Sequence, residues 1–153
     1  MQFDLDRVVF ALHAASTLYM AGVIWLVQLA QYPLFARIPP DAFRAYHDAY
    51  LRRVTFVVGP AMLVETATGV LLVYGTPAWV PQHLAWIGMA LLFALWISTA
   101  VLQVPLHRRL ERAHDPAAIR RLVATNWVRT LAWTARAGLV LTLLLDGGAR
   151  AAR

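Results

Sequence analysis

Two ionisable residues stand within strongly hydrophobic stretches of the sequence, where an isolated charge is costly. Glu65 lies within residues 54–74 and Arg136 lies within residues 122–145. An ionisable side chain at membrane depth normally pairs with an opposite charge or faces a polar cavity. We therefore expect Glu65 and Arg136 to form an ion pair. That pair either shapes the floor of a ligand pocket or only fixes the packing of two helices.

A stripe of polar and aromatic residues precedes Arg136 in the same stretch. Its members, separated by three, four and three residues, are Asn126, Arg129, Trp133 and Arg136. At about 100° per residue, this spacing places all four side chains on one face of a helix. Because charged side chains do not face lipid cheaply, we expect this face to point into a helical bundle.

Further polar residues gather at one end of the other hydrophobic stretches. His47 and Glu65 are eighteen residues apart, about five helical turns, so they share a face, with Tyr50 slightly off it. The first and third stretches end in Gln28, Gln31, Gln103 and His107. Together these side chains predict a polar funnel. Hydrogen bonding of Gln31 and Gln103 to neighbouring helices is the alternative.

The residue types of this funnel favour a site for a small, largely apolar aromatic or quinone-like molecule. His47 or His107 is the candidate general base, and Arg129 is the candidate for stabilising a developing phenolate or enolate oxygen. The candidate ligand-binding residues are Gln31, Tyr50, Glu65, Gln103 and Arg136. The competing interpretation is that His47, His107 and Arg129 only anchor helix ends at the membrane boundary.

The composition indicates that lipid is the solvent of this chain. Of its 153 residues, 60% are hydrophobic and 14% are charged, and the mean hydropathy is +0.57, values that exclude an ordinary soluble domain. The absence of cysteine excludes disulfides, thiolate metal sites and thiol nucleophiles. The net charge of +6 comes from arginine alone, and we expect it to orient the chain in the membrane rather than bind nucleic acid.

Four segments are long and apolar enough to cross about 30 Å of hydrocarbon. They are residues 8–35, 54–74, 84–104 and 122–145. The predicted fold is therefore all-α, an integral membrane four-helix bundle that forms one domain over residues 1–153. We expect the first span to be retained rather than cleaved as a signal peptide, because Asp4 and Asp6 precede it and no small-residue cleavage site follows.

The arginines predict the orientation of the bundle. Most of them lie in the connections 36–53 and 106–121, whereas the turn at 75–83 has no formal charge. Since positively charged loops stay in the cytoplasm, both termini are predicted to face outward. Within the connections, Pro40 with Asp41, and Asp115 with Pro116, are typical of helix starts.

The sequence also contains a faint duplication. Gln31-Tyr32-Pro33-Leu34 in the first half corresponds to Gln103-Val104-Pro105-Leu106 in the second. Each match is followed by an arginine-containing connection and another span. Because each half crosses the membrane twice, we expect two helical hairpins related as a parallel repeat.

Two segments of the second half carry a family resemblance. Gln103-Val104-Pro105-Leu106-His107, followed by Thr125-Asn126-Trp127-Val128-Arg129, resembles the four-helix membrane family of unknown function that includes the fungal anthrone oxygenases. In the first half, Tyr32-Pro33-Leu34-Phe35 resembles the proline-containing first hairpin of that family. The resemblance implies a bacterial inner-membrane protein and cofactor-independent oxygenation of an electron-rich aromatic, with Asn126, Arg129 and His107 near the substrate.

Other functions remain open on sequence grounds. One is a non-enzymatic accessory or structural subunit of a membrane complex, and another is transport by an oligomer. A weaker resemblance, through Ala11-Leu12-His13 and Met20-Ala21-Gly22, is to the four-helix membrane oxidases of porphyrinogen metabolism, where His13 would bind haem. No cofactor or metal site is otherwise predicted. The expected partners are membrane lipid, a small apolar ligand, and either a homo-oligomer or a larger membrane complex.

Overall fold

The chain folds into four antiparallel helical rods. The computed structural model describes residues 5–75 and 77–151, with side chains as far as Asp146, and contains no strand within them. The first rod is α1 (Leu5–Leu26), a π-helical turn η1 (Val27–Gln31), α2 (Tyr32–Leu34) and a 3₁₀ turn η2 (Phe35–Arg37). The second is α3 (Pro40–Tyr74). The third is α4 (Gln82–Ser98), a π-helical turn η3 (Thr99–Gln103) and α5 (Val104–Arg112), and the fourth is α6 (Pro116–Ala151).

All four rods are long and apolar enough to cross a membrane, which confirms the predicted four-helix membrane fold. Their spanning ranges are Leu5–Arg37, Pro40–Tyr74, Gln82–Arg112 and Pro116–Asp146. Each has more than 30 residues, against about 20 needed to cross the hydrocarbon. The helices therefore continue into the arginine-rich segments, and only short turns remain between them. The chain is a multi-pass membrane protein.

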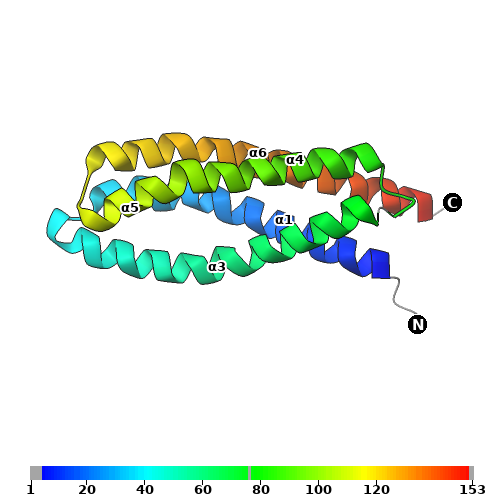
Figure 1. Ribbon diagram of the computed structural model, residues 1–153, viewed down its shortest axis with the longest axis horizontal. Coiled ribbons are helices and arrows are strands. Elements are labelled where there is room, and N and C mark those ends of the chain that lie inside the picture. Colours follow the sequence, from blue (N-terminus) through cyan, green and yellow to red (C-terminus); the bar gives the residue numbers. More distant parts are fainter. Residues whose placement is uncertain (1–4, 76, 152–153) are drawn as a thin grey trace.

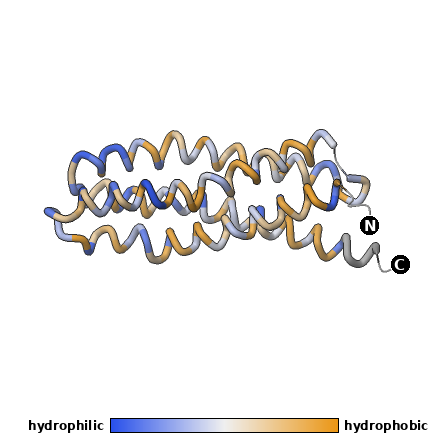
Figure 2. The backbone as a smooth tube through the Cα atoms, turned by 90° about the horizontal axis from the view of Figure 1, so that it is seen from below, coloured by the Kyte–Doolittle hydropathy of each residue, from blue (hydrophilic) through white to orange (hydrophobic). Residues whose placement is uncertain are grey.

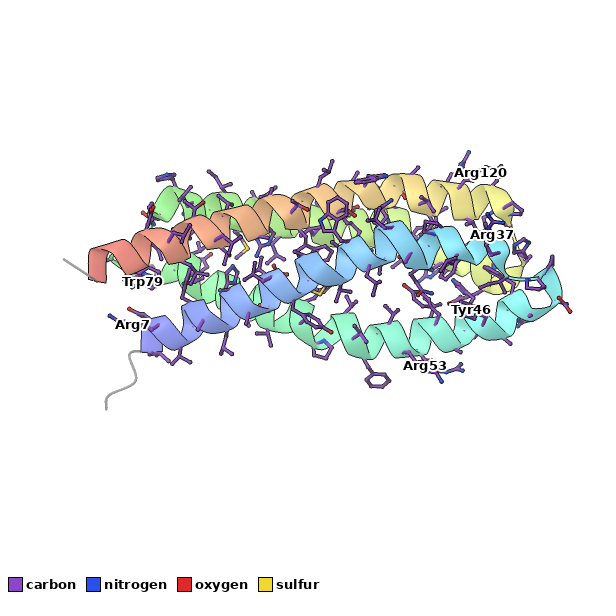
Figure 3. All side chains as sticks on the ribbon, turned by 180° about the vertical axis from the view of Figure 1, so that it is seen from behind. Arg7, Arg37, Tyr46, Arg53, Trp79 and Arg120 are labelled. Carbon is purple, nitrogen blue, oxygen red and sulfur yellow. The ribbon has the colours of Figure 1, made fainter. Side chains whose placement is uncertain are left out.

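Each rod packs against two neighbours, in the ring order α1, α3, α4 and α6. The described ends of the chain lie at the same end of the bundle, as Figure 1 shows. Hydrophilic stretches concentrate at the opposite end (Figure 2). Arg37, Arg53 and Arg120 lie in that half, whereas Arg7 and Trp79 lie at the end near the termini (Figure 3).

The two predicted helix starts are confirmed. Helix α3 begins at Pro40, whose missing N–H costs nothing in the first turn, and Asp41 follows it. Helix α6 begins at Pro116 behind Asp115. The Oδ1 atom of Asp115 accepts hydrogen bonds from the backbone N–H groups of Ala117 (2.9 Å) and Ala118 (3.1 Å). Its Oδ2 atom lies 2.6 Å from Nε of Arg109, which ties the end of α5 to the start of α6.

The duplication is visible in the backbone. The first and third rods each contain a π-helical turn just before the matching prolines Pro33 and Pro105. A proline within a helix lacks the N–H donor and its ring clashes with the carbonyl four residues earlier, and a π-helical turn relieves both problems by shifting the hydrogen-bond register. The two hairpins run in the same direction through the bundle, as a parallel repeat requires.

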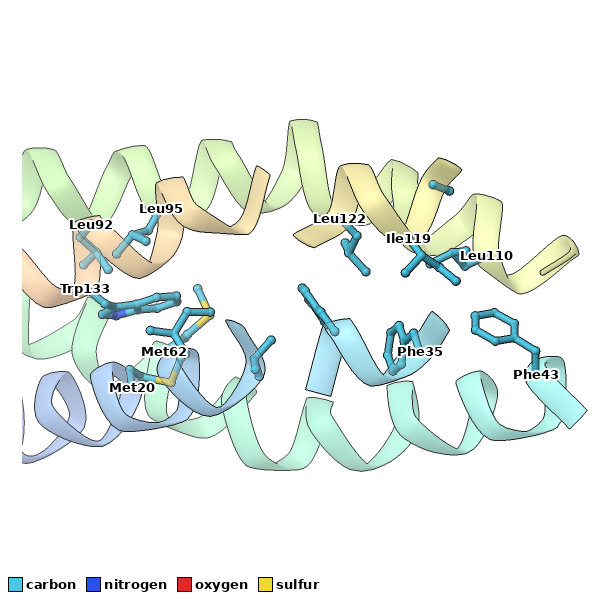
Figure 4. Close-up of a cluster of buried hydrophobic side chains, with 14 residues drawn as sticks. Met20, Phe35, Phe43, Met62, Leu92, Leu95, Leu110, Ile119, Leu122 and Trp133 are labelled. Carbon is cyan, nitrogen blue, oxygen red and sulfur yellow. The ribbon is translucent and has the colours of Figure 1, made fainter. Parts of the chain in front are cut away.

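The core divides along the bundle axis. Its larger cluster separates into one group near Met20, Met62 and Trp133 and another near Phe35 and Phe43, as Figure 4 shows. A second, smaller cluster lies toward the termini and contains Phe10, Ala14, Leu72, Val80, Val140 and Leu143. Many large apolar side chains point outward instead, such as those of Phe56, Val101 and Leu131. That outward apolar surface is what a lipid solvent requires.

Candidate functional site

A cavity of about 380 Å³ lies between the two groups of the larger core cluster. All four rods line it: α1, η1 and α2, then α3, then α4, η3 and α5, and finally α6 through Arg129. Most of the lining is apolar, and its members include Met20, Val23, Ile24, Val54, Val58 and Met62. Its polar lining residues include Tyr32, Tyr50, Gln103, His107 and Arg129. The volume lies within the range of roughly 300–1,000 Å³ that is usual for small-molecule sites.

A chain of hydrogen bonds reaches the cavity from within the protein. Nε2 of His47 lies 3.0 Å from Nδ1 of His107, and Nε2 of His107 lies 3.0 Å from the hydroxyl oxygen of Tyr32. The three residues come from α3, α5 and α2. His107 and Tyr32 line the cavity, whereas His47 is fully buried behind them.

This chain can hold its protons in two ways. In one, the Tyr32 hydroxyl donates to His107, and Nδ1–H of His107 donates to His47. In the other, both donors are reversed, so His47 donates to His107 and His107 donates to Tyr32. Switching from the first to the second passes the Tyr32 proton to His107 and the Nδ1 proton of His107 to His47. All three groups stay neutral only if a proton enters at Tyr32 and another leaves Nδ1 of His47. Nδ1 of His47 is buried and has no hydrogen-bond partner among the described residues.

Arg129 is a buried cation beside these hydrogen-bonded residues, with only 7% of its surface exposed. Its Nη1 donates to Oδ1 of Asn126 over 3.2 Å, and its guanidinium lies 5.2 Å from the centroid of the Trp133 ring. No carboxylate pairs with it within the part of the chain that the structure describes, and its Nε has no hydrogen-bond partner there. A buried cation without a counter-charge is costly. Arg129 therefore places an uncompensated positive charge in the wall of the cavity.

Asn126 lies behind Arg129 rather than in the cavity lining. Its amide nitrogen donates to Oε1 of Gln28 over 2.9 Å, and Gln28 in turn donates to the backbone carbonyl of Val123. The Thr130 hydroxyl also reaches Oε1 of Gln28, at 3.3 Å. This network fixes α6 against the first rod, and through Asn126 it fixes the guanidinium of Arg129.

Gln103 contributes a second unused polar atom. Its side chain is buried and lines the cavity, and its Nε2 donates to Thr125 over 3.3 Å. Its Oε1 acceptor finds no partner within residues 5–75 and 77–146. The predicted counterpart Gln31 has a different place, because it bonds to the Tyr46 hydroxyl over 2.8 Å and is absent from the cavity lining. The duplication therefore does not extend to these side chains.

The predicted pair between Glu65 and Arg136 is confirmed. Nε of Arg136 lies 2.9 Å from Oε1 of Glu65, across the diagonal of the bundle. Oε1 also accepts from the Thr17 hydroxyl (2.8 Å), Oε2 accepts from Nε1 of Trp133 (3.1 Å), and Arg136 donates to the backbone carbonyl of Gly88. These contacts join all four rods at one point. The pair lies outside the cavity lining, and Trp133 separates it from Arg129.

His13, the candidate haem ligand, is engaged within the helical bundle in this arrangement. Its Nδ1 lies 3.0 Å from the Thr68 hydroxyl and its Nε2 lies 3.4 Å from Nη2 of Arg136, so both ring nitrogens face partners. The space beside it has a volume of only about 40 Å³. At the other end, His47 and His107 contact each other directly, with no room for iron between them. No three histidine or carboxylate side chains come together in the described ranges.

The predicted inward stripe is confirmed, since Asn126, Arg129, Trp133 and Arg136 are all buried. One residue of the site was not predicted. Tyr32 joins the histidine pair to the cavity, and the only sequence signal for it was its place beside Pro33 in the duplicated segment.

Comparison with known proteins adds no precedent for this arrangement: no protein-family model, curated protein or solved structure matches the chain. The resemblance to the family of the anthrone oxygenases stays a prediction.

Proposed function

We propose that the bundle binds a small aromatic or quinone-like molecule in the cavity, with an anionic or strongly polarised oxygen of the ligand against Arg129. One observation carries this proposal: a buried arginine that lines a cavity and has no carboxylate partner in the described chain. Arg136 is buried on the same helix and has its carboxylate. The contrast between the paired Arg136 and the unpaired Arg129 supports a ligand that supplies the negative charge for Arg129.

The remaining lining favours a flat, apolar ligand. Apolar side chains form most of the wall, with valine the most frequent, and Arg129 is among its few polar groups. A sugar, a nucleotide or an inorganic ion would leave many of its own polar atoms unpaired against such a wall. An aromatic ring with one or two oxygens matches both the apolar wall and the polar groups of the lining. Gln103 is a further polar residue of the same lining.

The chemistry that follows is proton abstraction and oxygenation. The chain formed by Tyr32, His107 and His47 takes a proton from a phenol or enol, and Arg129 stabilises the resulting oxygen anion. With dioxygen as the oxidant, a ring CH₂ next to that electron-rich system becomes C=O. One oxygen atom of O₂ enters the product and the other leaves as water, so no reducing cofactor is consumed.

Binding is tested by titrating the detergent-solubilised protein with 2-hydroxy-1,4-naphthoquinone, which is anionic at neutral pH and is called hydroxynaphthoquinone below, and with uncharged naphthoquinone. Wild-type protein is expected to prefer the anion, and Arg129→Gln is expected to lose that preference by about 10-fold or more. Gln is chosen because it keeps a polar side chain of similar length. Equal affinity of wild type and Arg129→Gln for the anion would contradict the proposal.

Turnover needs a separate test, because binding alone does not make an enzyme. Oxygen consumption with a hydroxylated anthrone is measured for wild type and for His107→Phe, which keeps the aromatic packing and removes both nitrogens. We expect the variant to lose oxygen uptake while still binding hydroxynaphthoquinone. Oxygen consumption by His107→Phe at the wild-type rate would show that the hydrogen-bonded histidines take no part in the mechanism.

A non-enzymatic accessory or structural subunit is the second candidate function. The contacts of Glu65 and Arg136 favour a structural role for the half of the bundle near the termini. The two residues join the four rods, and neither lines the large cavity. Size measurement of the protein extracted in mild detergent separates the two functions. Stable association with a larger complex supports the subunit, and a monomer or small homo-oligomer that retains an aromatic ligand supports the binding protein.

A further inference from the structure

The cavity has an opening on the outer surface of the bundle. Four of its lining residues are exposed: Thr55, Leu63, Trp96 and Val104. The first two belong to α3, and the others belong to α4 and α5. The lining residues of α1, α2 and α6 are buried or half-buried. The cavity therefore opens sideways, between α3 and the rod formed by α4, η3 and α5.

Two contacts between the helices limit this opening along the bundle axis. Toward the termini, Nε1 of Trp96 donates to the Thr66 hydroxyl over 3.1 Å and joins α4 to α3. Toward the arginine-rich end, the contact between His47 and His107 joins α3 to α5. Between them, α3 changes direction (Figure 1), as expected at its internal Pro60. We call this opening, with the exposed rim residues Thr55, Leu63, Trp96 and Val104, the window. His47 and His107 lie at its edge near the arginine-rich end.

The rim of the window is uncharged and mostly apolar. Its exposed rim residues carry no charge and belong to segments apolar enough to span the membrane. Arg52 and Arg53 precede Thr55 on α3, so the window begins just beyond the charged end of that helix. A molecule that enters here comes from the lipid phase, with its polar group toward the arginine-rich end of the bundle.

We propose that the ligand is a membrane-dissolved amphiphile whose ring lies in the cavity and whose hydrocarbon tail leaves through this window into the lipid. The inference rests on the proposed function, because it takes the ring and its oxygen at Arg129 as given. It adds the class of ligand and the route by which the ligand arrives. An acyl or isoprenoid chain fits the uncharged rim.

Gly59 provides a way to narrow the window. It lines the cavity, and a Cβ atom at this position would meet no other atom within 4 Å. A larger side chain can therefore begin at this position without a clash at its first carbon. Gly22 is the matched control, because a Cβ atom there is equally free but the residue does not line the cavity.

The experiment uses the full chain in phospholipid vesicles and two hydroxynaphthoquinone probes. One carries no tail, and the other carries an alkyl tail with a diazirine midway along it. After irradiation, the tailed probe is expected to label rim residues such as Thr55, Leu63 and Trp96. Gly59→Leu is expected to reduce labelling about 10-fold or more, and Gly22→Leu is expected to leave it unchanged.

The outcomes separate this inference from the proposed function. If the tailless probe binds in an Arg129-dependent manner but the tail labels only buried walls of the first rod, the cavity is a binding site and the window is not its entrance. If Gly59→Leu labels as strongly as wild type, the same conclusion holds. If neither probe binds, the proposed function and the inference both fail.

Discussion

Arg129 is held by Asn126, three residues earlier on the same helix, through a hydrogen bond of 3.2 Å between Nη1 and Oδ1. The acceptor is a neutral amide, so the charge of the guanidinium is oriented but not compensated. Seven residues further along α6, Arg136 contacts the carboxylate of Glu65. Both arginines are buried, but only Arg136 has a carboxylate partner. This difference is expected if Arg129 binds a ligand and Arg136 holds the helices together.

Replacing each arginine by methionine should have opposite effects on stability. Arg136→Met leaves a buried carboxylate without its cation and should lower the free energy of unfolding by about 3–5 kcal/mol. Arg129→Met removes a buried charge that has no counter-charge, and should leave the stability of the ligand-free protein unchanged or higher. Thermal unfolding in the same detergent compares the two. A loss of similar size in both variants would show that Arg129 is a packing residue.

The Glu65 and Arg136 side chains should be strongly coupled. Glu65→Leu and Arg136→Met are each expected to destabilise the bundle, and the double variant should cost less than the sum by about 0.5–3 kcal/mol. Glu65→Leu combined with Thr142→Val is the control, since Thr142 is exposed and bonds only within its own helix. Additive effects in both pairs would mean that the ion pair contributes nothing of its own.

Asp115 should make stability depend on acid pH. The backbone N–H of Ala118, followed by that of Ala117 and by Arg109, lowers the pKa of this carboxyl below its ordinary value of 3.8. A lowered pKa means that the stabilisation is complete above the ordinary value and is lost as pH falls through the lower, folded value. Asp115→Asn keeps the cap but has no charge, so its difference from wild type should be present near neutral pH and shrink in acid. A difference independent of pH would contradict this account.

The orientation of the chain can be tested with single cysteines, because the natural sequence has none. Ala78 and Ala113 are exposed and lie at opposite ends of the bundle. With the arginine-rich end in the cytoplasm, Ala78→Cys should react with a membrane-impermeant maleimide on intact cells, and Ala113→Cys should react only after permeabilisation. The reverse pattern would place both termini in the cytoplasm.

Much of the fold was predictable because lipid leaves few choices. Four apolar segments had to be helices, and two charges within them had to find each other, which fixed the relation of Glu65 to Arg136. The inward stripe of α6 followed from its spacing. Sequence periodicity was sufficient for these features because each depends on one helix or on one pairing.

The candidate site was less predictable, because its contacts join residues far apart in the sequence. His47 and His107 are 60 residues apart, and Tyr32 and His107 are 75 apart. Spacing within a helix contains no information about which of several polar side chains meet across a bundle. The duplication also predicted too much symmetry: Gln103 lines the cavity, whereas the matching Gln31 bonds to Tyr46 outside it.

The most direct test of the central claim is native mass spectrometry of the protein taken from its own membranes in mild detergent, comparing wild type, Arg129→Gln and Arg120→Gln. Arg120 is exposed on the same helix and serves as the charge control. We predict that wild type and Arg120→Gln carry the same small organic molecule, which is absent from Arg129→Gln. The same occupancy in all three proteins, or an empty wild-type protein that also binds no hydroxynaphthoquinone, would contradict the account.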